Sequence, residues 1–330
     1  MIISQTPLRI SFAGGGTDLS KFWRKEEGKV LASTIDKYIY VIIKKRFGDE
    51  IVLNYTKRET VNSVLELKHD LVREALLMTG IKSGVEIWTP ADIPSSGSGL
   101  GSSSTLTVGL LNAFYTFQGT QVTAEQLAQE SCNIEIDILG KPIGKQDQYI
   151  AAYGGINALT FNPDKSVTVD AIKASNHSFR VFGSNLLLFY TGITRESSSI
   201  LTKQKSVTNN KREILTQMRD QVPVIQKLIV NETSFNNIGL ILDKTWKLKK
   251  QISKKISNPI IDEMYQKALD SGALGGKISG AGGGGFLLLY VPRENQNSVR
   301  KALENYREFP FMLEPDGSKI IFNIKRDYWK

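Results

Sequence analysis

A stretch of glycine and serine between two apolar segments has the composition of an anion-binding loop. It reads Pro-Ser-Ser-Gly-Ser-Gly-Leu-Gly-Ser-Ser-Ser over residues 94–104, after a predicted strand at 84–89 and before an apolar run at 105–117 that predicts a helix. Three glycines in five residues let the backbone turn sharply and approach a ligand without an intervening Cβ. The serines that follow are good helix N-caps, and free N–H groups at a helix N-terminus attract phosphate. A plain linker is the alternative for this stretch on its own.

Two further stretches have the same glycine-rich character. Residues 6–18 read Thr-Pro-Leu-Arg-Ile-Ser-Phe-Ala-Gly-Gly-Gly-Thr-Asp, and residues 277–286 read Lys-Ile-Ser-Gly-Ala-Gly-Gly-Gly-Gly-Phe. Each is a weak signal alone. Together with residues 94–104 they favour a ligand site built from backbone over three unrelated linkers.

A carboxylate on a predicted helix is a candidate metal ligand. The helix opens at Thr123, where Gln126 completes a capping box, and it closes before Gly140. At about 100° per residue, Glu135 falls on the flank of an apolar face, which is formed by Leu127, Ser131, Ile134 and Ile138. A carboxylate directed toward a core is costly unless it is paired or metal-bound. Geometry alone leaves a metal ion and an unseen Lys or Arg equally open.

A second acid, Asp147, opens the next predicted helix, which begins at 145–149 and ends at Gly154. An acid in the first turn of a helix can simply be favourable to the helix dipole.

The three glycine-rich stretches, in this order and at this spacing, resemble the GHMP kinases, which include galactokinase, homoserine kinase, mevalonate kinase and phosphomevalonate kinase. Residues 94–104 match the family's Pro-x-x-x-Gly-Leu-Gly-Ser-Ser phosphate loop, apart from an inserted residue or so before Gly99. The resemblance runs from Thr6 to about Phe286. The Phe-Ala-Gly-Gly-Gly-Thr-Asp form of the first stretch looks most like the D-glycero-D-manno-heptose 7-phosphate kinases, with the fucokinases nearby.

The resemblance implies an α+β fold of two domains with the active site between them. Residues 1–178 would form an N-terminal ATP-binding domain like ribosomal protein S5 domain 2, and residues 179–330 a ferredoxin-like C-terminal domain. ATP would be the co-substrate, with Mg²⁺ held by Ser103 and Glu135, and magnesium's preference for hard oxygen ligands agrees with that pair. The ATP-binding residues implied are Ser96, Gly97, Ser98, Gly99, Leu100, Gly101, Ser102, Ser103 and Ser104.

The same resemblance assigns the acceptor side of the site. Asp147 would accept the proton of the acceptor hydroxyl, and Arg9 would keep that carboxylate ionised. Asp18, nine residues after Arg9 as in galactokinases, would bind sugar hydroxyls. The substrate-binding residues implied are Gly15, Gly16, Thr17, Asp18, Arg195, Gly280, Ala281 and Gly282. Glycines stand at positions 15 and 16, where galactokinase has Glu-His, and this argues against galactose.

The implied reaction is phosphorylation of the C1 hydroxyl of D-glycero-D-manno-heptose 7-phosphate to the 1,7-bisphosphate, toward nucleotide-activated heptose. The phosphate already on the sugar needs a cation. Arg195 is the first candidate, ahead of Lys141 and Lys145.

Three other functions compete with this one. A fucokinase-like or other neutral-sugar 1-kinase would share the site. A catalytically inactive sugar-binding regulator is disfavoured by the joint presence of Ser103, Glu135 and Asp147. A Rossmann dehydrogenase needs an acid about 20 residues after the glycine loop, at the end of a second strand, where this chain has the turn 118–122 followed by a helix.

Composition bounds the remaining possibilities. The chain has 330 residues, 41% of them hydrophobic, and a formal net charge of +9. Its lysines are scattered, and the cluster of Lys247, Lys249, Lys250, Lys254 and Lys255 indicates a solvated helix face. We therefore expect no nucleic-acid partner.

The single cysteine, Cys132, favours a reducing compartment. No signal peptide or long apolar segment is present, so a cytoplasmic protein without membrane contact is expected, possibly a homodimer.

Several elements outside the site are also predicted. Residues 2–12 form a strand, 29–45 a hairpin or pair of strands, 61–79 a helix, and 156–170 paired strands. The second half consists of long helices broken near Pro223, strands on either side of the glycine-rich stretch, and two terminal strands (310–313 and 319–324) that complete the C-terminal layer.

Overall fold

A computed structural model of the chain describes residues 1–93, 97–193 and 209–324. Its elements in the first half are β1 (Ile2–Ala13), α1 (Ser20–Trp23), β2 (Gly28–Lys45), β3 (Ile51–Asn54), β4 (Arg58–Val61), η1 (Val64–Glu66), α2 (Asp70–Thr79), β5 (Val85–Trp88), α3 (Ser102–Gln118), α4 (Ala124–Cys132), η2 (Asn133–Ile138), α5 (Gln146–Tyr153), β6 (Ile156–Phe161) and β7 (Val167–Ala171). Those in the second half are α6 (Asn176–Ser184), β8 (Leu186–Tyr190), α8 (Asn209–Arg219), α9 (Gln221–Val230), α10 (Asn236–Ile252), α11 (Pro259–Asp270), β9 (Gly275–Ile278), β10 (Phe286–Tyr290), η3 (Arg293–Asn295), α12 (Gln296–Ala302) and β11 (Lys319–Asn323).

The larger sheet is organised around one long strand. Among the described residues it has eight strands: six in the order β11-β1-β2-β5-β3-β4, with β6 paired to β2 and β7 paired to β6. The prediction of a hairpin at 29–45 is wrong, because β2 is a single 18-residue strand. One edge of β2 pairs with β1, while the other pairs with β6 along residues 28–33 and with β5 along residues 42–45. Because the two ends of β2 pair with different strands along the same edge, β2 continues as one strand instead of turning back on itself.

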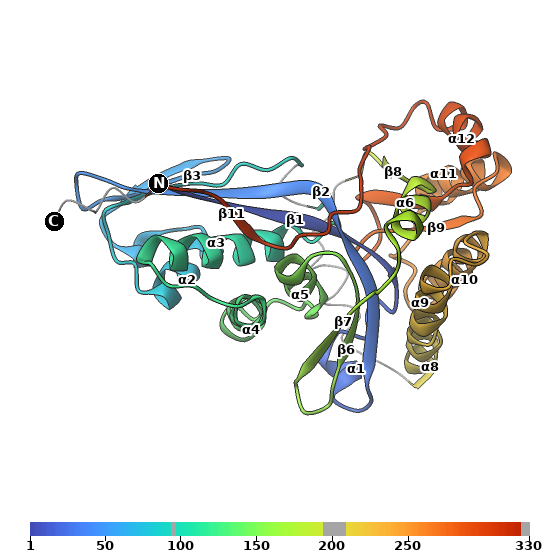
Figure 1. Ribbon diagram of the computed structural model, residues 1–330, viewed down its shortest axis with the longest axis horizontal. Coiled ribbons are helices and arrows are strands. Elements are labelled where there is room, and N and C mark those ends of the chain that lie inside the picture. Colours follow the sequence, from blue (N-terminus) through green and yellow to red (C-terminus); the bar gives the residue numbers. More distant parts are fainter. Residues whose placement is uncertain (94–96, 194–208, 325–330) are drawn as a thin grey trace.

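Helices cover one face of this sheet (Figure 1). The central one, α3, is buried, as its apolar sequence predicts, and it packs on β1 and β2. Gly109 makes the close approach possible, since a Cβ there would lie 2.8 Å from Thr6 Oγ1. The helix predicted at 61–79 is shorter than expected, because Leu67 is extended (φ −64°, ψ 128°) and α2 begins only at Asp70.

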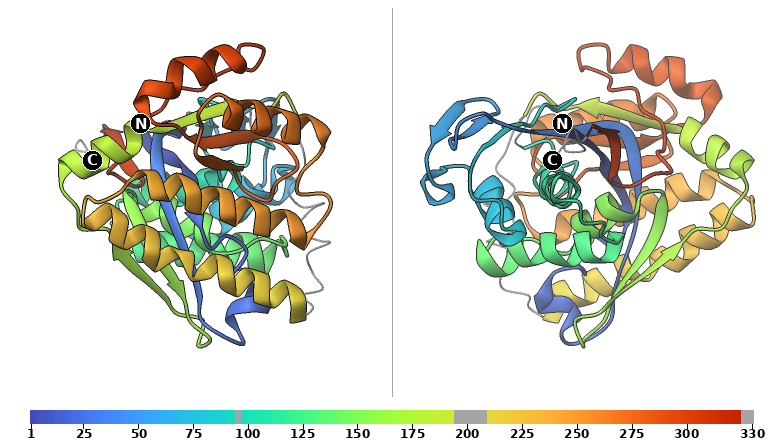
Figure 2. Two further views of the ribbon diagram at one scale, coloured as in Figure 1. Left: turned by 90° about the vertical axis from the view of Figure 1, so that its right-hand side faces the viewer. Right: turned by 60° about the vertical axis from the view of Figure 1, so that its left-hand side comes forward.

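The second half forms a smaller antiparallel sheet, β8-β10-β9. Figure 2 (left) shows the long helix α10 beside α8 and α9, and α10 also packs on β9. The predicted division at residue 178 falls within α6. The last strand does not complete the C-terminal layer as expected. Instead, β11 pairs with β1 in the larger sheet, and residues 310–313 contribute only an isolated bridge at Leu313.

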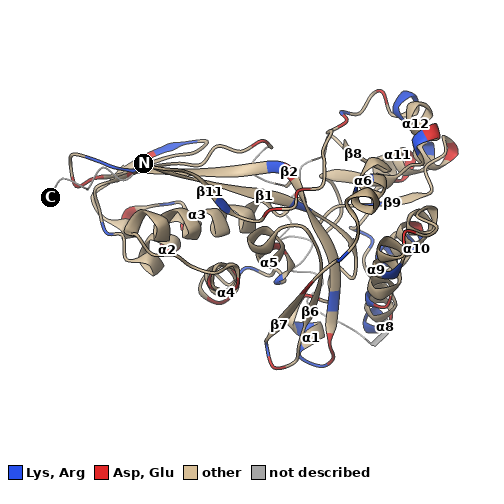
Figure 3. Cartoon of the chain, viewed as in Figure 1, with Lys and Arg blue, Asp and Glu red and all other residues tan. Residues whose placement is uncertain are grey.

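The charged residues and the helix lengths agree with the composition. Figure 3 shows lysine and arginine spread over both halves of the chain. Within the described ranges, every helix is too short or too polar to span a bilayer.

Candidate active site

An arginine–aspartate pair joins β1 to α5 beside the phosphate loop, residues 94–104. Arg9 Nε and Nη2 donate to the two carboxylate oxygens of Asp147, each at 2.7 Å, and Nη1 donates to the Gly99 carbonyl at 2.6 Å. The arginine side chain is 4% exposed and the aspartate side chain 23%. A buried bidentate guanidinium thus fixes a carboxylate that remains open to a substrate. The sequence-predicted pair is brought together as expected.

The phosphate loop bends through left-handed backbone at Gly97, Gly99 and Gly101, whose φ values are 76°, 72° and 80°. Gly101 is the N-cap of α3, and it leaves the first-turn N–H groups without a side-chain cap. We expected a serine in that role; a glycine there leaves the helix N-terminus available to an anion. Ser98 Oγ accepts the Leu100 N–H within the loop. Ser96, also assigned to ATP, lies outside the described residues.

Ser103 and Glu135 meet at the start of α3. Ser103 Oγ donates to Glu135 Oε2 at 2.6 Å, and Gln148 Nε2 donates to Glu135 Oε1 at 3.3 Å. Glu135 is fully buried, and burial raises the pKa of its carboxyl, while the Ser103 hydroxyl acts in the opposite direction. In the described part of the chain no Lys or Arg lies within ion-pair distance of it. Two hard oxygens, one on an uncompensated buried carboxylate, fit a Mg²⁺ ion better than the ion-pair alternative.

Glu135 reaches this position from a π-helix, η2, rather than from a continued α-helix. The Leu139 N–H donates to the Ile134 carbonyl, five residues back. The wider turn changes the periodicity beyond Cys132. Ile138, predicted on the buried face, is therefore 50% exposed, whereas Glu135 and Ile134 are buried as predicted.

Asp18 lies at the other side of the site and is almost completely buried. Its Oδ1 accepts the Gly16 N–H at 2.9 Å, and burial, together with the nearby charge of Asp147, raises the pKa of its carboxyl. The Thr17 side chain hydrogen-bonds to the backbone and not to a ligand, because its Oγ1 donates to the carbonyls of Gly14 and Lys29. Gly15 and Gly16 are half-buried beside them.

Gly144 makes room for Asp18, a role that sequence reasoning missed. A Cβ at Gly144 would lie 1.9 Å from Asp18 Oδ2. We expect Gly144→Ala to displace that carboxylate, to destabilise the fold by about 1–3 kcal/mol, and to raise KM for the sugar. Thermal unfolding and acceptor kinetics measure both effects. Gly48→Ala, with no atom within 4 Å of its Cβ, is the control, and equal behaviour of the two variants would contradict the steric role.

The glycine-rich loop 279–285 packs directly against the phosphate loop. A Cβ on Gly99 would lie 2.5 Å from the Ser279 carbonyl, and one on Gly280 would lie 2.9 Å from Gly99 Cα. Of the predicted substrate-binding residues in this loop, Gly280 therefore borders the predicted ATP loop, whereas Gly282 lies against Ile256.

Two lysines near this contact were missed. Lys249, expected on a solvated helix face, is buried, and its Nζ donates to the Gly280 carbonyl at 2.5 Å. Lys277 is also buried and donates to the backbone carbonyl and the hydroxyl of Ser11 at 2.8 and 3.1 Å. For Lys277, its position in the glycine-rich stretch 277–286 was a sequence signal that it could lie near the site. For Lys249, nothing in the local sequence distinguishes it from the exposed lysines beside it.

The cations expected to hold a sugar phosphate are placed differently. Lys141 forms an ion pair with Asp70 at 3.8 Å. Lys145 donates to the Lys165 carbonyl, and its Nζ lies 4.7 Å from the Trp23 ring centroid. Neither lysine is a free cation at the acceptor site. Arg195, the first candidate, lies outside the described residues.

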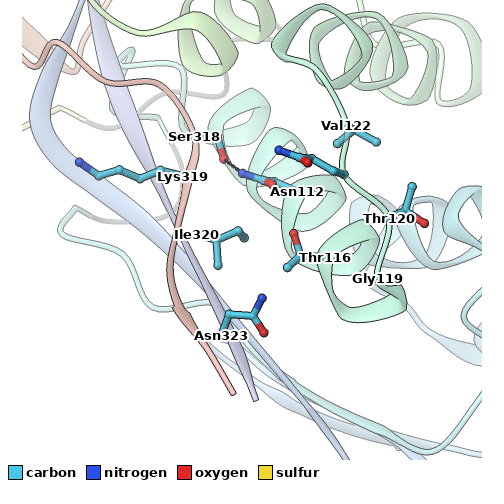
Figure 4. Close-up of a pocket in the computed structure, with 10 residues that line it drawn as sticks. Asn112, Thr116, Gly119, Thr120, Val122, Ser318, Lys319, Ile320 and Asn323 are labelled. Carbon is cyan, nitrogen blue, oxygen red and sulfur yellow. Dashed lines mark hydrogen bonds between the residues drawn. The ribbon is translucent and has the colours of Figure 1, made fainter. Parts of the chain in front are cut away.

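A shallow groove of about 410 Å³ lies elsewhere, between the end of α3 and β11 (Figure 4). Asn112 and Ser318 meet across it in a hydrogen bond of 3.0 Å. None of the residues assigned to catalysis or binding lines this groove.

Comparisons with known proteins found matches that cover nearly the whole chain. The sequence profile of the GHMP kinases N terminal domain matches residues 59–155, and that of the GHMP kinases C terminal domain matches residues 226–308. A D-glycero-alpha-D-manno-heptose 7-phosphate kinase of Campylobacter jejuni is 33% identical, over 96% of this chain and 98% of its own. A bifunctional fucokinase/GDP-fucose pyrophosphorylase of Arabidopsis thaliana is 25% identical, over 92% of this chain and 31% of its own. Among solved structures, a D-glycero-D-manno-heptose 1-phosphate kinase of Bacteroides thetaiotaomicron superposes with a TM-score of 0.82 at 26% identity, covering 98% of this chain and all of the other.

Proposed function

The chain belongs to the GHMP kinase family, and on that premise we propose that it transfers the terminal phosphoryl group of ATP to the C1 hydroxyl of D-glycero-D-manno-heptose 7-phosphate. The observation that carries the proposal is the Arg9–Asp147 pair, a positioned carboxylate tied through Gly99 to the loop that would hold the nucleotide. Similarity over nearly the full length to a heptose 7-phosphate kinase supports the choice of sugar.

The roles of the residues follow from their positions. Asp147 accepts the proton of the C1 hydroxyl as its oxygen attacks the terminal phosphorus of ATP, and the bond to the bridging oxygen of ADP breaks. Arg9 holds the carboxylate in place and favours its ionised form. The phosphate loop and the N-terminus of α3 bind the phosphates through backbone N–H groups. Asp18 orients the sugar by accepting hydrogen bonds from its hydroxyls.

Ser103 and Glu135 are the residues that would hold Mg²⁺, which supplies charge neutralisation for the transferred phosphoryl group. We also propose that the chain has two domains, with β11 belonging to the first, and that it is a cytoplasmic protein that can form a homodimer. The free Cys132 is buried, as suits a structural thiol in a reducing compartment.

The sharpest test of this function is which carbon of the acceptor sugar already carries a phosphate, because the names of the two heptose kinase relatives differ on this point. One acts on a heptose 7-phosphate and the other is named for a heptose 1-phosphate. A kinase that acts at C1 cannot use an acceptor that already carries phosphate there. We expect turnover of heptose 7-phosphate, none of heptose 1-phosphate, and at least tenfold lower kcat/KM for unphosphorylated heptose, mannose and fucose.

A coupled ADP-release assay over these acceptors, with the product position assigned by ³¹P NMR, measures this preference. Turnover of heptose 1-phosphate would overturn the C1 assignment. A preference for fucose, or equal efficiency with unphosphorylated heptose, would instead identify a neutral-sugar kinase.

A further inference from the structure

We propose that Lys249, Lys277 and Ser279 form a buried phosphate-binding site on the C-terminal side of the active site. The proposal rests on the proposed phosphoryl transfer, and it concerns side chains to which no role has been given in that reaction. The phosphate is either the one carried by the acceptor sugar or the terminal phosphate of ATP. The experiment below separates these two sources.

The three side chains converge from two elements of the second half. Lys277 is in β9, and Ser279 follows two residues later, where its N–H continues the pairing with Phe286. Residues two apart in an extended strand face the same side, and Lys277 on that side reaches Ser11 of β1. Lys249 comes from α10 and reaches the Gly280 carbonyl next to Ser279. All three therefore lie where the second half meets β1 and the phosphate loop.

These groups have more hydrogen-bonding capacity than the described protein uses. A lysine ammonium has three donors. Lys249 uses one of them and Lys277 two, all on neutral oxygens, and neither forms an ion pair within the described ranges. Ser279 is 1% exposed, and its buried hydroxyl has no partner among the described residues. Unused donors on buried ammonium groups are costly unless an anion completes them.

The charges around the pair also favour an anion. Burial lowers the pKa of Lys249 to about 8, with a further decrease from Arg9, and Asp18 opposes both. Burial, Lys249 and Arg9 lower the pKa of Lys277 well below its usual range, again against Asp18. Arg9 is already paired with Asp147, so Asp18 is the acid that acts on the two lysines among the described residues. A bound phosphate would favour the protonated form of each amine, so its binding should take up protons at pH values around the lowered pKa of Lys249, about 8.

The test measures kcat and KM of Lys249→Gln and Ser279→Ala for ATP, heptose 7-phosphate and unphosphorylated heptose. A charge-assisted hydrogen bond contributes enough to binding that we expect KM to rise by about tenfold or more on losing Lys249, and by less on losing Ser279. If the site holds the sugar's phosphate, only KM for heptose 7-phosphate rises. If it holds the terminal phosphate of ATP, KM for ATP rises and both acceptors are affected equally.

Lys250→Gln is the matched control, because this neighbouring lysine of α10 pairs with Asp262 at the surface. The proposal is overturned if Lys249→Gln and Ser279→Ala keep all KM values within twofold of the wild type. If Lys249→Gln fails to fold, the KM values of Ser279→Ala decide the test, because this substitution removes no hydrogen bond within the described protein. If the wild type uses no sugar phosphate, the proposed function fails, and titration with an ATP analogue still tests the site.

Discussion

Replacing Asp147 by asparagine is expected to lower kcat by about two to four orders of magnitude, the range associated with loss of a general base. The amide keeps the size of the side chain but cannot accept the proton of the acceptor hydroxyl. The proposed phosphate contacts come from the phosphate loop and α3, so the dissociation constant for an ATP analogue should stay within a fewfold of the wild type.

The amide also removes one of the two oxygens that accept from Arg9. Some loss of stability is therefore expected, and thermal unfolding must accompany the kinetics. Asp170→Asn, at an exposed position on β7, is the matched control and should leave kcat unchanged. A folded Asp147→Asn enzyme with near-normal kcat would remove Asp147 from the role of base.

The second large effect is expected for Glu135→Gln. Glutamine can still accept the Ser103 hydroxyl but carries no charge to attract a divalent cation. The Mg²⁺ concentration that gives half the maximal rate should rise at least tenfold, which corresponds to about 1.4 kcal/mol. Ser103→Ala should show a smaller shift in the same direction. Titration of the rate with Mg²⁺ at saturating ATP measures both variants.

The melting temperature distinguishes weaker Mg²⁺ binding by Glu135→Gln from misfolding of the variant. Burial raises the pKa of the Glu135 carboxyl, so ionising this group costs more free energy in the folded protein than in the unfolded chain. Removing that charge should leave the melting temperature equal or higher. Glu130→Gln on α4, whose carboxylate accepts from Tyr115 and Gln126, is the control. Unchanged Mg²⁺ dependence in Glu135→Gln would show that the metal is held elsewhere.

Local sequence signals predicted the parts of the site that depend on nearby residues. The phosphate loop, α3, α5 and the buried flank of Glu135 follow from glycine placement, caps and helical periodicity. The Arg9–Asp147 contact came from family resemblance, because it joins residues 138 positions apart.

The features that could not be predicted depend on distant partners. The continuity of β2 is set by β5 and β6, which lie far along the chain. Lys249 has the same charge and helix as its exposed neighbours, and only the approach of Gly280 buries it. The π-helix altered the exposure of Ile138 without any glycine or proline to signal it.

The pairing of β11 with β1 sets the order in which the larger sheet can be finished during synthesis. β1 is translated long before β11, and the outer edge of its residues 2–5 is covered by residues 319–323, with the Met1 amino group donating to the Ile324 carbonyl at 2.8 Å. During synthesis that part of the edge stays open until residues 319–323 have emerged. An open strand edge can pair with other chains. The nascent protein therefore carries an unpaired strand edge throughout the synthesis of the segment between β1 and β11, and shielding by a chaperone would be useful over that interval.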